Sequence, residues 1–266
     1  MSKKPIRSWS QYSTYMKCPQ LFFYQYIERS VPRTDSIPLY AGTTVLHGHE
    51  EMCKKKIKGE DFTFEEILKL INTFWEKKSE TFSSKLTEFF LEKRKLKGYM
   101  EAYYHYFINN DITPLFTEKD LMWEPEGYNF AIRGIIDRID TDNSLVDLKT
   151  SKKSPPFNKA KGSFYLDKKT GYDLQLDIYV MLMRNVLNIE PSKAKLEFIV
   201  KTKTPKVVPI EMDISEEKLS STLDLLANLE ESIQKGIFPK NRLSTYCGEK
   251  WCAKWEECTG LKKIEV

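Results

Sequence analysis

Residues 134–150 read GIIDRIDTDNSLVDLKT, and this stretch decides the fold of the chain. Two apolar runs with the alternation of half-buried strands flank Thr141-Asp142-Asn143, which is typical of a tight turn. Asp137, Asp147 and Lys149 interrupt these strands, although Asp and Lys are poor strand residues. A buried charge is costly unless it is paired or holds a metal, so the three residues are candidates for a functional site.

The spacing of the three charged residues makes a geometric prediction. Asp147 and Lys149 are two residues apart, so on a strand both side chains point to the same face. A loop with an even number of residues would place Asp137 opposite Leu148 and on the wrong face. An odd loop or a β-bulge would pair Asp137 with Asp147 or Lys149. We therefore predict an odd loop or a β-bulge, a feature often found beside active sites.

The chemistry that suits these residues is phosphodiester hydrolysis. Two converging carboxylates repel each other unless a cation lies between them, and Mg²⁺ needs only one or two carboxylates plus substrate phosphate oxygens. Such a metal polarises the phosphoryl oxygen and generates the nucleophile. Lys149 would stabilise the pentavalent phosphate or orient the attacking water. The alternative is a surface ion pair on an exposed hairpin.

The composition is that of a soluble globular protein. The chain has 266 residues, 41% of them apolar and 30% charged, which fits one large domain or one domain with a subdomain. Its net charge of +4 is compatible with a nucleic-acid partner. No segment reaches the roughly 18–20 apolar residues of a membrane span, and the N-terminus lacks a signal-peptide core, so we expect a cytoplasmic location. No GxxxxGK[ST] motif is present, which argues against an ATP-driven motor or kinase.

Hydrophobic periodicity predicts a mixed α/β layout, with one sheet and helices packed on it. Pro19 should break or kink the first helix, and Ser215 and Gly236 should cap the last long one. An aromatic stripe within residues 63–110 is interpreted as core packing. Helices are expected over residues 8–28, 43–58, 63–110 (two or more), 172–188 and 216–235, and strands over 128–139, 144–149, 194–200 and 206–212.

Five motifs together resemble the PD-(D/E)XK nuclease superfamily, in particular its RecB-like branch of phage exonucleases, CRISPR adaptation nucleases and bacterial helicase–nuclease domains. GIIDRID resembles a G-x-x-D-R-x-D strand, DLKT a D-x-K-T motif and QLDIY a Q-x-x-x-Y helix. LHGHEE resembles a G-x-x-x-H-x-x-x-E helix, and SWSQYSTYMKCPQLFFY resembles the S-x-S-x-x-x-x-Y-x-x-C-P start of that branch. The motifs keep the family's order over residues 8–258.

The resemblance implies a restriction-endonuclease-like core, in which a central mixed sheet is flanked by helices and preceded by a helical region. We expect one domain over residues 1–266, with a helical part to about 115, a catalytic core over about 116–235 and a cysteine-containing tail over 236–266.

The resemblance also implies a divalent metal site for Mg²⁺ or Mn²⁺. Its ligands would be Asp137, Asp147 and His47, and Lys149 would assist the chemistry. Gly42 precedes His47 by five residues rather than four, so His49 is the alternative ligand.

Further candidate residues surround this proposed centre. Gln175 and Tyr179 are implied to line the active site and contact the scissile strand, or else their helix only packs its apolar face on the sheet. Glu118 and Glu124 precede the Asp137 strand, and either could be an auxiliary acid. His105 lies in an aromatic stripe and is interpreted as structural.

The cysteines form a second pattern. Cys247, Cys252 and Cys258 lie close together near the C-terminus, and the family resemblance implies that Cys18 joins them to hold a 4Fe-4S cluster. Four residues separate the first two cysteines of this group instead of the usual two, so zinc or free thiols remain alternatives. Cys53 is interpreted as an ordinary helix cysteine.

A basic connection follows the second strand of the hairpin. Such a charge run is usually a solvated loop, but lysines supply most non-specific DNA affinity and aromatic rings can stack on bases. Because no base-reading module is apparent, little sequence specificity is expected. The residues concerned are Lys152, Lys153, Lys159, Lys161, Lys168 and Lys169, with Phe157, Phe164 and Tyr165 between them.

The sequence therefore predicts a metal-dependent DNA exonuclease for recombination or repair, of phage or prophage origin. Its partner would be a helicase or a single-strand annealing protein, and no membrane is involved. The alternatives are a flap endonuclease, or a DNA-binding subunit that keeps the nuclease fold without cutting.

Overall fold

The computed structural model describes residues 4–31, 36–159, 163–166, 170–249 and 252–261. The chain divides into two compact units. The central unit comprises residues 35–121 and 135–214, and the terminal unit comprises residues 1–34, 122–134 and 215–266. The expectation of one domain over residues 1–266 stays a prediction.

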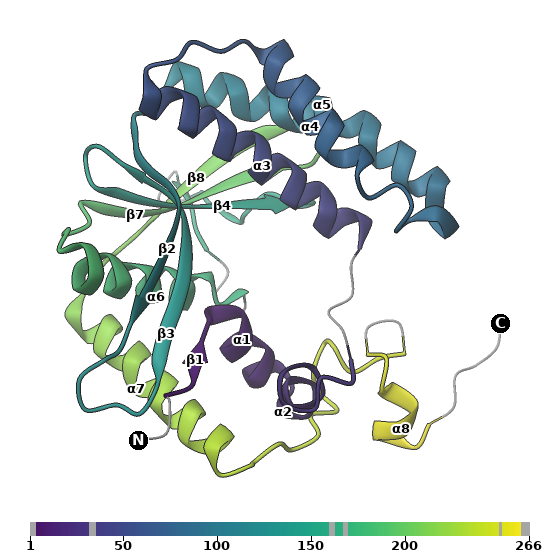
Figure 1. Cartoon of the computed structure of the whole chain (residues 1–266), viewed down its shortest axis with the longest axis vertical. Helices are drawn as coiled ribbons and strands as arrows, with labels where there is room; N and C mark the ends of the chain where they lie inside the picture. The colour runs from purple at the N-terminus through teal and green to yellow at the C-terminus, as the bar shows by residue number, and fades with distance from the viewer. Residues whose placement is uncertain (1–3, 32–35, 160–162, 167–169, 250–251, 262–266) are drawn as a thin grey trace. The chain divides into compact units, whose positions relative to one another are not determined.

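The central unit is built on a mixed sheet (Figure 1). Strand β3 (Ala131–Asp140) pairs with β2 (Pro114–Trp123) and runs antiparallel to β4 (Ser144–Ser151). β4 runs parallel to β7 (Lys193–Val200), which is antiparallel to β8 (Lys206–Met212). The strands expected from about 128, 144, 194 and 206 are all present, which confirms the mixed α/β layout.

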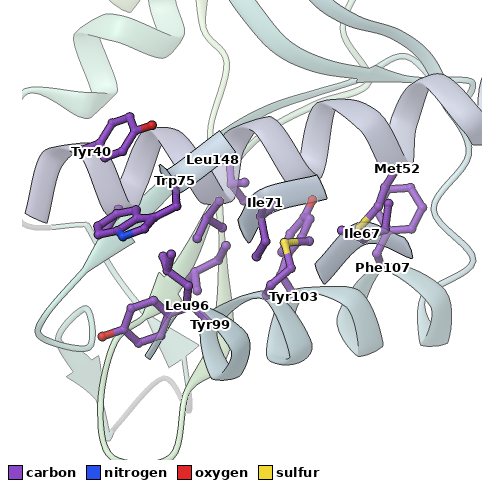
Figure 2. Close-up of a cluster of buried hydrophobic side chains, with 14 of the residues drawn as sticks. Tyr40, Met52, Ile67, Ile71, Trp75, Leu96, Tyr99, Tyr103, Phe107 and Leu148 are labelled. Carbon is purple, nitrogen blue, oxygen red and sulfur yellow. The ribbon is translucent and has the colours of Figure 1, made fainter. Parts of the chain in front are cut away.

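Three helices cover one side of β4, β7 and β8, namely α3 (Ile37–Lys58), α4 (Phe64–Glu76) and α5 (Leu86–Asn109), with the short 3₁₀ helix η2 (Ser83–Lys85) before α5 (Figure 1). Their apolar faces meet in a buried cluster to which β4 contributes Leu148 (Figure 2). The aromatic stripe expected to form core is therefore core. Its largest buried members include Ile67, Ile71, Trp75, Phe89, Tyr99, Tyr103 and Phe107.

The other side of the sheet carries α6 (Tyr172–Leu182), which continues as the π-helical turn η4 (Met183–Leu187) (Figure 1). In the connection before α6, β5 (Phe157–Asn158) pairs antiparallel with β6 (Ser163–Phe164). Three lysines of this connection, Lys161, Lys168 and Lys169, lie outside the described residues.

The terminal unit contains both ends of the chain. Strand β1 (Ile6–Arg7) runs parallel to the first residues of β3, and α1 (Trp9–Lys17), α2 (Pro19–Phe22) and the π-helical turn η1 (Phe23–Ile27) follow it. Helices α7 (Glu216–Gln234) and α8 (Trp255–Thr259) complete the unit. Arg7 donates two hydrogen bonds to Glu230 of α7, at 2.7 and 3.1 Å.

Pro19 divides the first expected helix, as predicted. Cys18 is extended and Pro19 is the first residue of α2, where its missing N–H costs no helical hydrogen bond. The Ser215 hydroxyl accepts from the Lys218 N–H and caps α7, and Gly236 follows that helix with φ 72°. None of the helices in the described ranges combines the length and the apolar character needed to cross a membrane.

Candidate active site

The hairpin between β3 and β4 has a three-residue loop, residues 141–143, in which Asn143 adopts a left-handed conformation (φ 63°). The Asp142 carboxylate accepts from the Ser144 N–H and hydroxyl, both at 2.9 Å, and so stabilises the turn. Arg138 pairs with Val146, and this register places Asp137 opposite Asp147. The prediction of an odd loop is confirmed.

Asp137 interrupts the backbone hydrogen-bond ladder between β3 and β4. Its Oδ2 accepts the backbone N–H of Leu148 at 2.7 Å, and its carbonyl oxygen accepts from the Thr117 hydroxyl at 3.1 Å. Burial, and then the neighbouring Asp147 carboxylate, raise the pKa of Asp137 well above its ordinary value. A side chain thus replaces a backbone acceptor in the sheet and lies beside a second carboxylate.

Lys149 supplies the positive charge beside Asp147. Its Nζ lies 2.6 Å from Asp147 Oδ2 and 5.1 Å from the centre of the Tyr172 ring. Burial lowers the pKa of Lys149, but the carboxylates of Asp147 and Asp137 outweigh it, so the pKa is raised and the ammonium stays charged. Burial also raises the pKa of Asp147, an effect that the Lys149 ammonium opposes. The structure therefore brings together the three residues that the sequence singled out.

Glu118 adds a further carboxylate to this centre. It has a positive φ of 47° within β2, a strained conformation of the kind that clusters at functional sites. Burial raises the pKa of Glu118, and the charges of Glu50 and Asp147 add to the effect. Glu124 is different, because its side chain is 55% exposed and pairs with Lys4 at 3.4 Å in the terminal unit.

This charge balance fits a divalent cation. The carboxyl groups of Asp137, Asp147 and Glu118 lie close enough to act on one another, and burial makes their negative charges costly, so a bound cation would relieve the repulsion between them. Carboxylate oxygens are the ligands that Mg²⁺ and Mn²⁺ prefer.

Helix α3 presents a second group of ligand-capable side chains. His47, Glu50 and Glu51 are half-buried, and one ligand atom from each lies within 4.8 Å of the others. Lys54 pairs with both glutamates, at 2.7 and 2.8 Å. The sequence analysis named His47 and missed Glu50. The signal was the H-x-x-E-E spacing, which places all three on one helical face. Glu118 interacts electrostatically with Glu50 and with Asp147, so it links the two groups.

His49, the alternative ligand, faces the core instead. Its side chain is fully buried, its Nδ1 lies 2.8 Å from the Tyr103 hydroxyl, and its ring bonds to the Asp137 backbone. Burial, and then the charge of Arg138, lower the pKa of His49 to about 3, so the ring is neutral near pH 7. This placement favours His47 over His49 as a ligand.

A buried network lies behind Asp137. Arg138 is 1% exposed and donates to both carboxylate oxygens of Glu197 on β7, at 2.7 and 3.1 Å, across the intervening strand β4. It also donates to Asp140 and to the Tyr103 hydroxyl, both at 2.8 Å. Because these bonds tie β3 to β7 and α5, they fix the strand from which Asp137 projects.

Two further positions of the expected site lie on α6. Gln175 Nε2 donates to the Tyr179 hydroxyl at 2.8 Å, and Tyr179 is 7% exposed. Burial raises the pKa of Tyr179, and the charges of Asp147 and Asp137 raise it further. The two side chains therefore lie on the side of α6 that is near the acidic pair, while Ile178 and Leu182 of the same helix are buried.

The four cysteines of the expected cluster, Cys18, Cys247, Cys252 and Cys258, line one pocket in the terminal unit. Trp255 lines it together with them. Among the described residues, no three of these sulfurs lie within 4.8 Å of one another.

The sequence of this chain matches the family model of the PD-(D/E)XK nuclease superfamily over residues 7–259. The chain belongs to this superfamily.

A solved structure shows the same fold as this PD-(D/E)XK chain. The crystal structure of a candidate exonuclease from Eubacterium rectale is 15% identical in sequence, covers 97% of this chain and 90% of its own, and has a TM-score of 0.61. The structure of SSO0001 is 14% identical and covers 61% of this chain and 70% of its own, but its TM-score of 0.32 is too low to support an argument. No curated protein matches the sequence.

Proposed function

We propose that this protein is a divalent-metal-dependent DNA exonuclease. The observation that carries the proposal is the convergence of Asp137, Asp147 and Lys149 at the point where the hairpin ladder breaks. Membership of the PD-(D/E)XK superfamily supports it.

Each residue has a role in this reaction. Asp137 and Asp147 would hold Mg²⁺ or Mn²⁺. Glu118 and the α3 side chains of His47, Glu50 and Glu51 would contribute to the same centre. The metal, when bound, supplies a polarised phosphoryl oxygen and an activated water. Lys149, whose ammonium stays charged, would stabilise the negative charge that develops on the phosphate. Gln175 and Tyr179 would contact the strand that is cut.

The substrate and the role follow from the family resemblance. DNA recognised largely without regard to sequence suits a chain with a net charge of +4. A function in recombination or repair, beside a helicase or a single-strand annealing protein, is part of the proposal, as is a phage or prophage origin.

The test is cleavage of end-labelled linear and closed circular DNA with Mg²⁺, with Mn²⁺ and with EDTA. The unmodified protein should degrade linear DNA only with metal and spare closed circles. Lys149→Ala should abolish the activity, because it removes the charge beside Asp147. Lys193→Ala is the matched control, because that lysine lies at the opposite end of β7 from the site, 53% exposed. Nicked circles would indicate an endonuclease, and DNA binding without cleavage under any metal would indicate a non-catalytic subunit.

We also propose that Cys18, Cys247, Cys252 and Cys258 hold a 4Fe-4S cluster. The pocket that all four cysteines line supports this set. Protein purified without oxygen should contain about four iron atoms and four sulfides per chain. Cys18→Ser should lower both contents, whereas Cys53→Ser, which alters a buried cysteine of α3, should leave them unchanged. Zinc in place of iron would overturn the assignment.

A further inference from the structure

Two lysines meet where β4 and β7 end. These strands run parallel, and Ser151 and Val200 form their last pair. The Lys201 N–H donates to the Ser151 carbonyl at 2.6 Å, so the next residues, Lys152 and Lys201, follow side by side. Lys149 lies on the same strand three residues before Lys152, about 10 Å away at roughly 3.3 Å per residue.

The ammonium of Lys201 is held by an aromatic ring and a backbone carbonyl, with the Glu92 carboxylate near enough to oppose the lowering of its pKa by burial. The residue is half-buried, its Nζ lies 5.8 Å from the centre of the Tyr99 ring on α5, and it donates to the Pro38 carbonyl at 3.4 Å. Lys201 has no carboxylate ion-pair partner within the described ranges of the chain. Burial makes a charged ammonium costly, so this position would gain from an incoming anion.

A third lysine comes from α5. Lys95 is exposed, lies one helical turn before Tyr99 and pairs with Glu92 at 3.0 Å. Burial lowers the pKa of Lys201, and the charges of Lys152 and Lys95 lower it further against the opposing charge of Glu92. Three ammonium groups against one carboxylate leave excess positive charge in this part of the central unit.

We infer that Lys201, Lys152 and Lys95 form a binding site for a backbone phosphate of the nucleic-acid strand, a few nucleotides from the phosphate that is hydrolysed. The inference rests on the proposed function for the identity of the ligand. Lys152 follows β4, the strand that carries Lys149, so the site lies next to the proposed catalytic lysine along the chain. The sequence analysis placed Lys152 among the loop lysines and did not predict its two partners, Lys201 directly after β7 and Lys95 on α5.

The experiment measures the binding of fluorescently labelled single-stranded DNA in EDTA at several salt concentrations. For single strands, each phosphate that is neutralised contributes about 0.7 to the slope of log K against log salt. The double variant Lys152→Gln/Lys201→Gln should weaken binding and lower that slope by about 0.7, the contribution of one phosphate. Lys201→Arg keeps the charge and should keep the slope. Lys193→Gln, a charge change at the opposite end of β7, should leave both quantities unchanged.

The outcomes separate this inference from the proposed function. The single variant Lys201→Gln is measured beside Lys193→Gln, and equal losses of affinity in the two would show only an effect of net charge and would overturn the site. An unchanged slope in the double variant, or no binding by the unmodified protein, would also overturn it. Because binding is measured without metal, the site would stand even if the protein failed to cut DNA. Conversely, DNA cleavage by the unmodified protein together with an unchanged salt slope in the double variant would overturn the phosphate site and leave the proposed nuclease function standing.

Discussion

Replacing Glu197 by Gln tests the buried network behind Asp137. Arg138 and Glu197 are each 1% exposed and are joined by two hydrogen bonds of 2.7 and 3.1 Å. The substitution keeps the shape of the side chain but leaves the guanidinium with Asp140 as its remaining carboxylate, at 2.8 Å. Breaking a buried ion pair costs about 3–5 kcal/mol, and the remaining carboxylate places this variant near 3 kcal/mol.

The assay is thermal unfolding followed by circular dichroism. For a protein of this size each kcal/mol lowers the midpoint by about 2–4 °C, so Glu197→Gln should lower it by about 6–12 °C. Glu211→Gln is the matched control. Glu211 pairs with Lys193 at 3.4 Å on the surface, 59% exposed, and such pairs contribute about 0–1 kcal/mol.

A midpoint for Glu197→Gln within error of that for Glu211→Gln would refute this reasoning, because the buried pair would then stabilise no more than an exposed one. The triple variant Arg138→Met/Asp140→Asn/Glu197→Leu removes all three charges and should recover part of the loss, since no unpaired ion remains.

Three further substitutions test local packing and capping. Gly48→Ala would place a Cβ 2.7 Å from Met100 Sδ and 2.9 Å from Ile71 Cγ2 in the helical core, so urea unfolding should show a loss of about 1–3 kcal/mol. Gly98→Ala is the same change in a helix with room for it, the nearest atom being 3.5 Å away, and should stabilise by up to about 1 kcal/mol. Equal effects of Gly48→Ala and Gly98→Ala on the free energy of unfolding would contradict the packing argument. Ser215→Ala removes the side-chain cap of α7 and should cost about 1 kcal/mol, with Ser215→Asp retaining stability.

The sequence predicted the parts of the fold that depend on neighbouring residues. The β3–β4 hairpin and its odd loop followed from alternation, from turn residues and from the need to place Asp137 on the face of Asp147. The break at Pro19 followed from the geometry of proline. Strand β2, residues 114–123, was missed entirely because Glu118, Lys119 and Asp120 lie inside it, and such residues are rare in strands.

What the sequence could not predict depends on residues that are distant in the chain. Nothing in the local pattern distinguishes His47 from His49, and only the contact of His49 with Tyr103 places it in the core. The partnership of Arg138 with Glu197 also needed the order of the strands, since β4 lies between them. For the same reason the link between Glu50 and Glu118 became visible only in the structure.

The bond from the Leu148 N–H to the Asp137 carboxylate has a consequence for how inactive variants are designed. Asp137→Ala would remove a candidate ligand and also strand a peptide N–H inside the sheet, so a loss of activity would mix two causes. Asp137→Asn keeps an oxygen that can accept that N–H and removes only the charge. The asparagine variant is therefore the cleaner catalytic knockout, and a difference in unfolding midpoint between the two variants would measure how far the hairpin depends on its own active-site side chain.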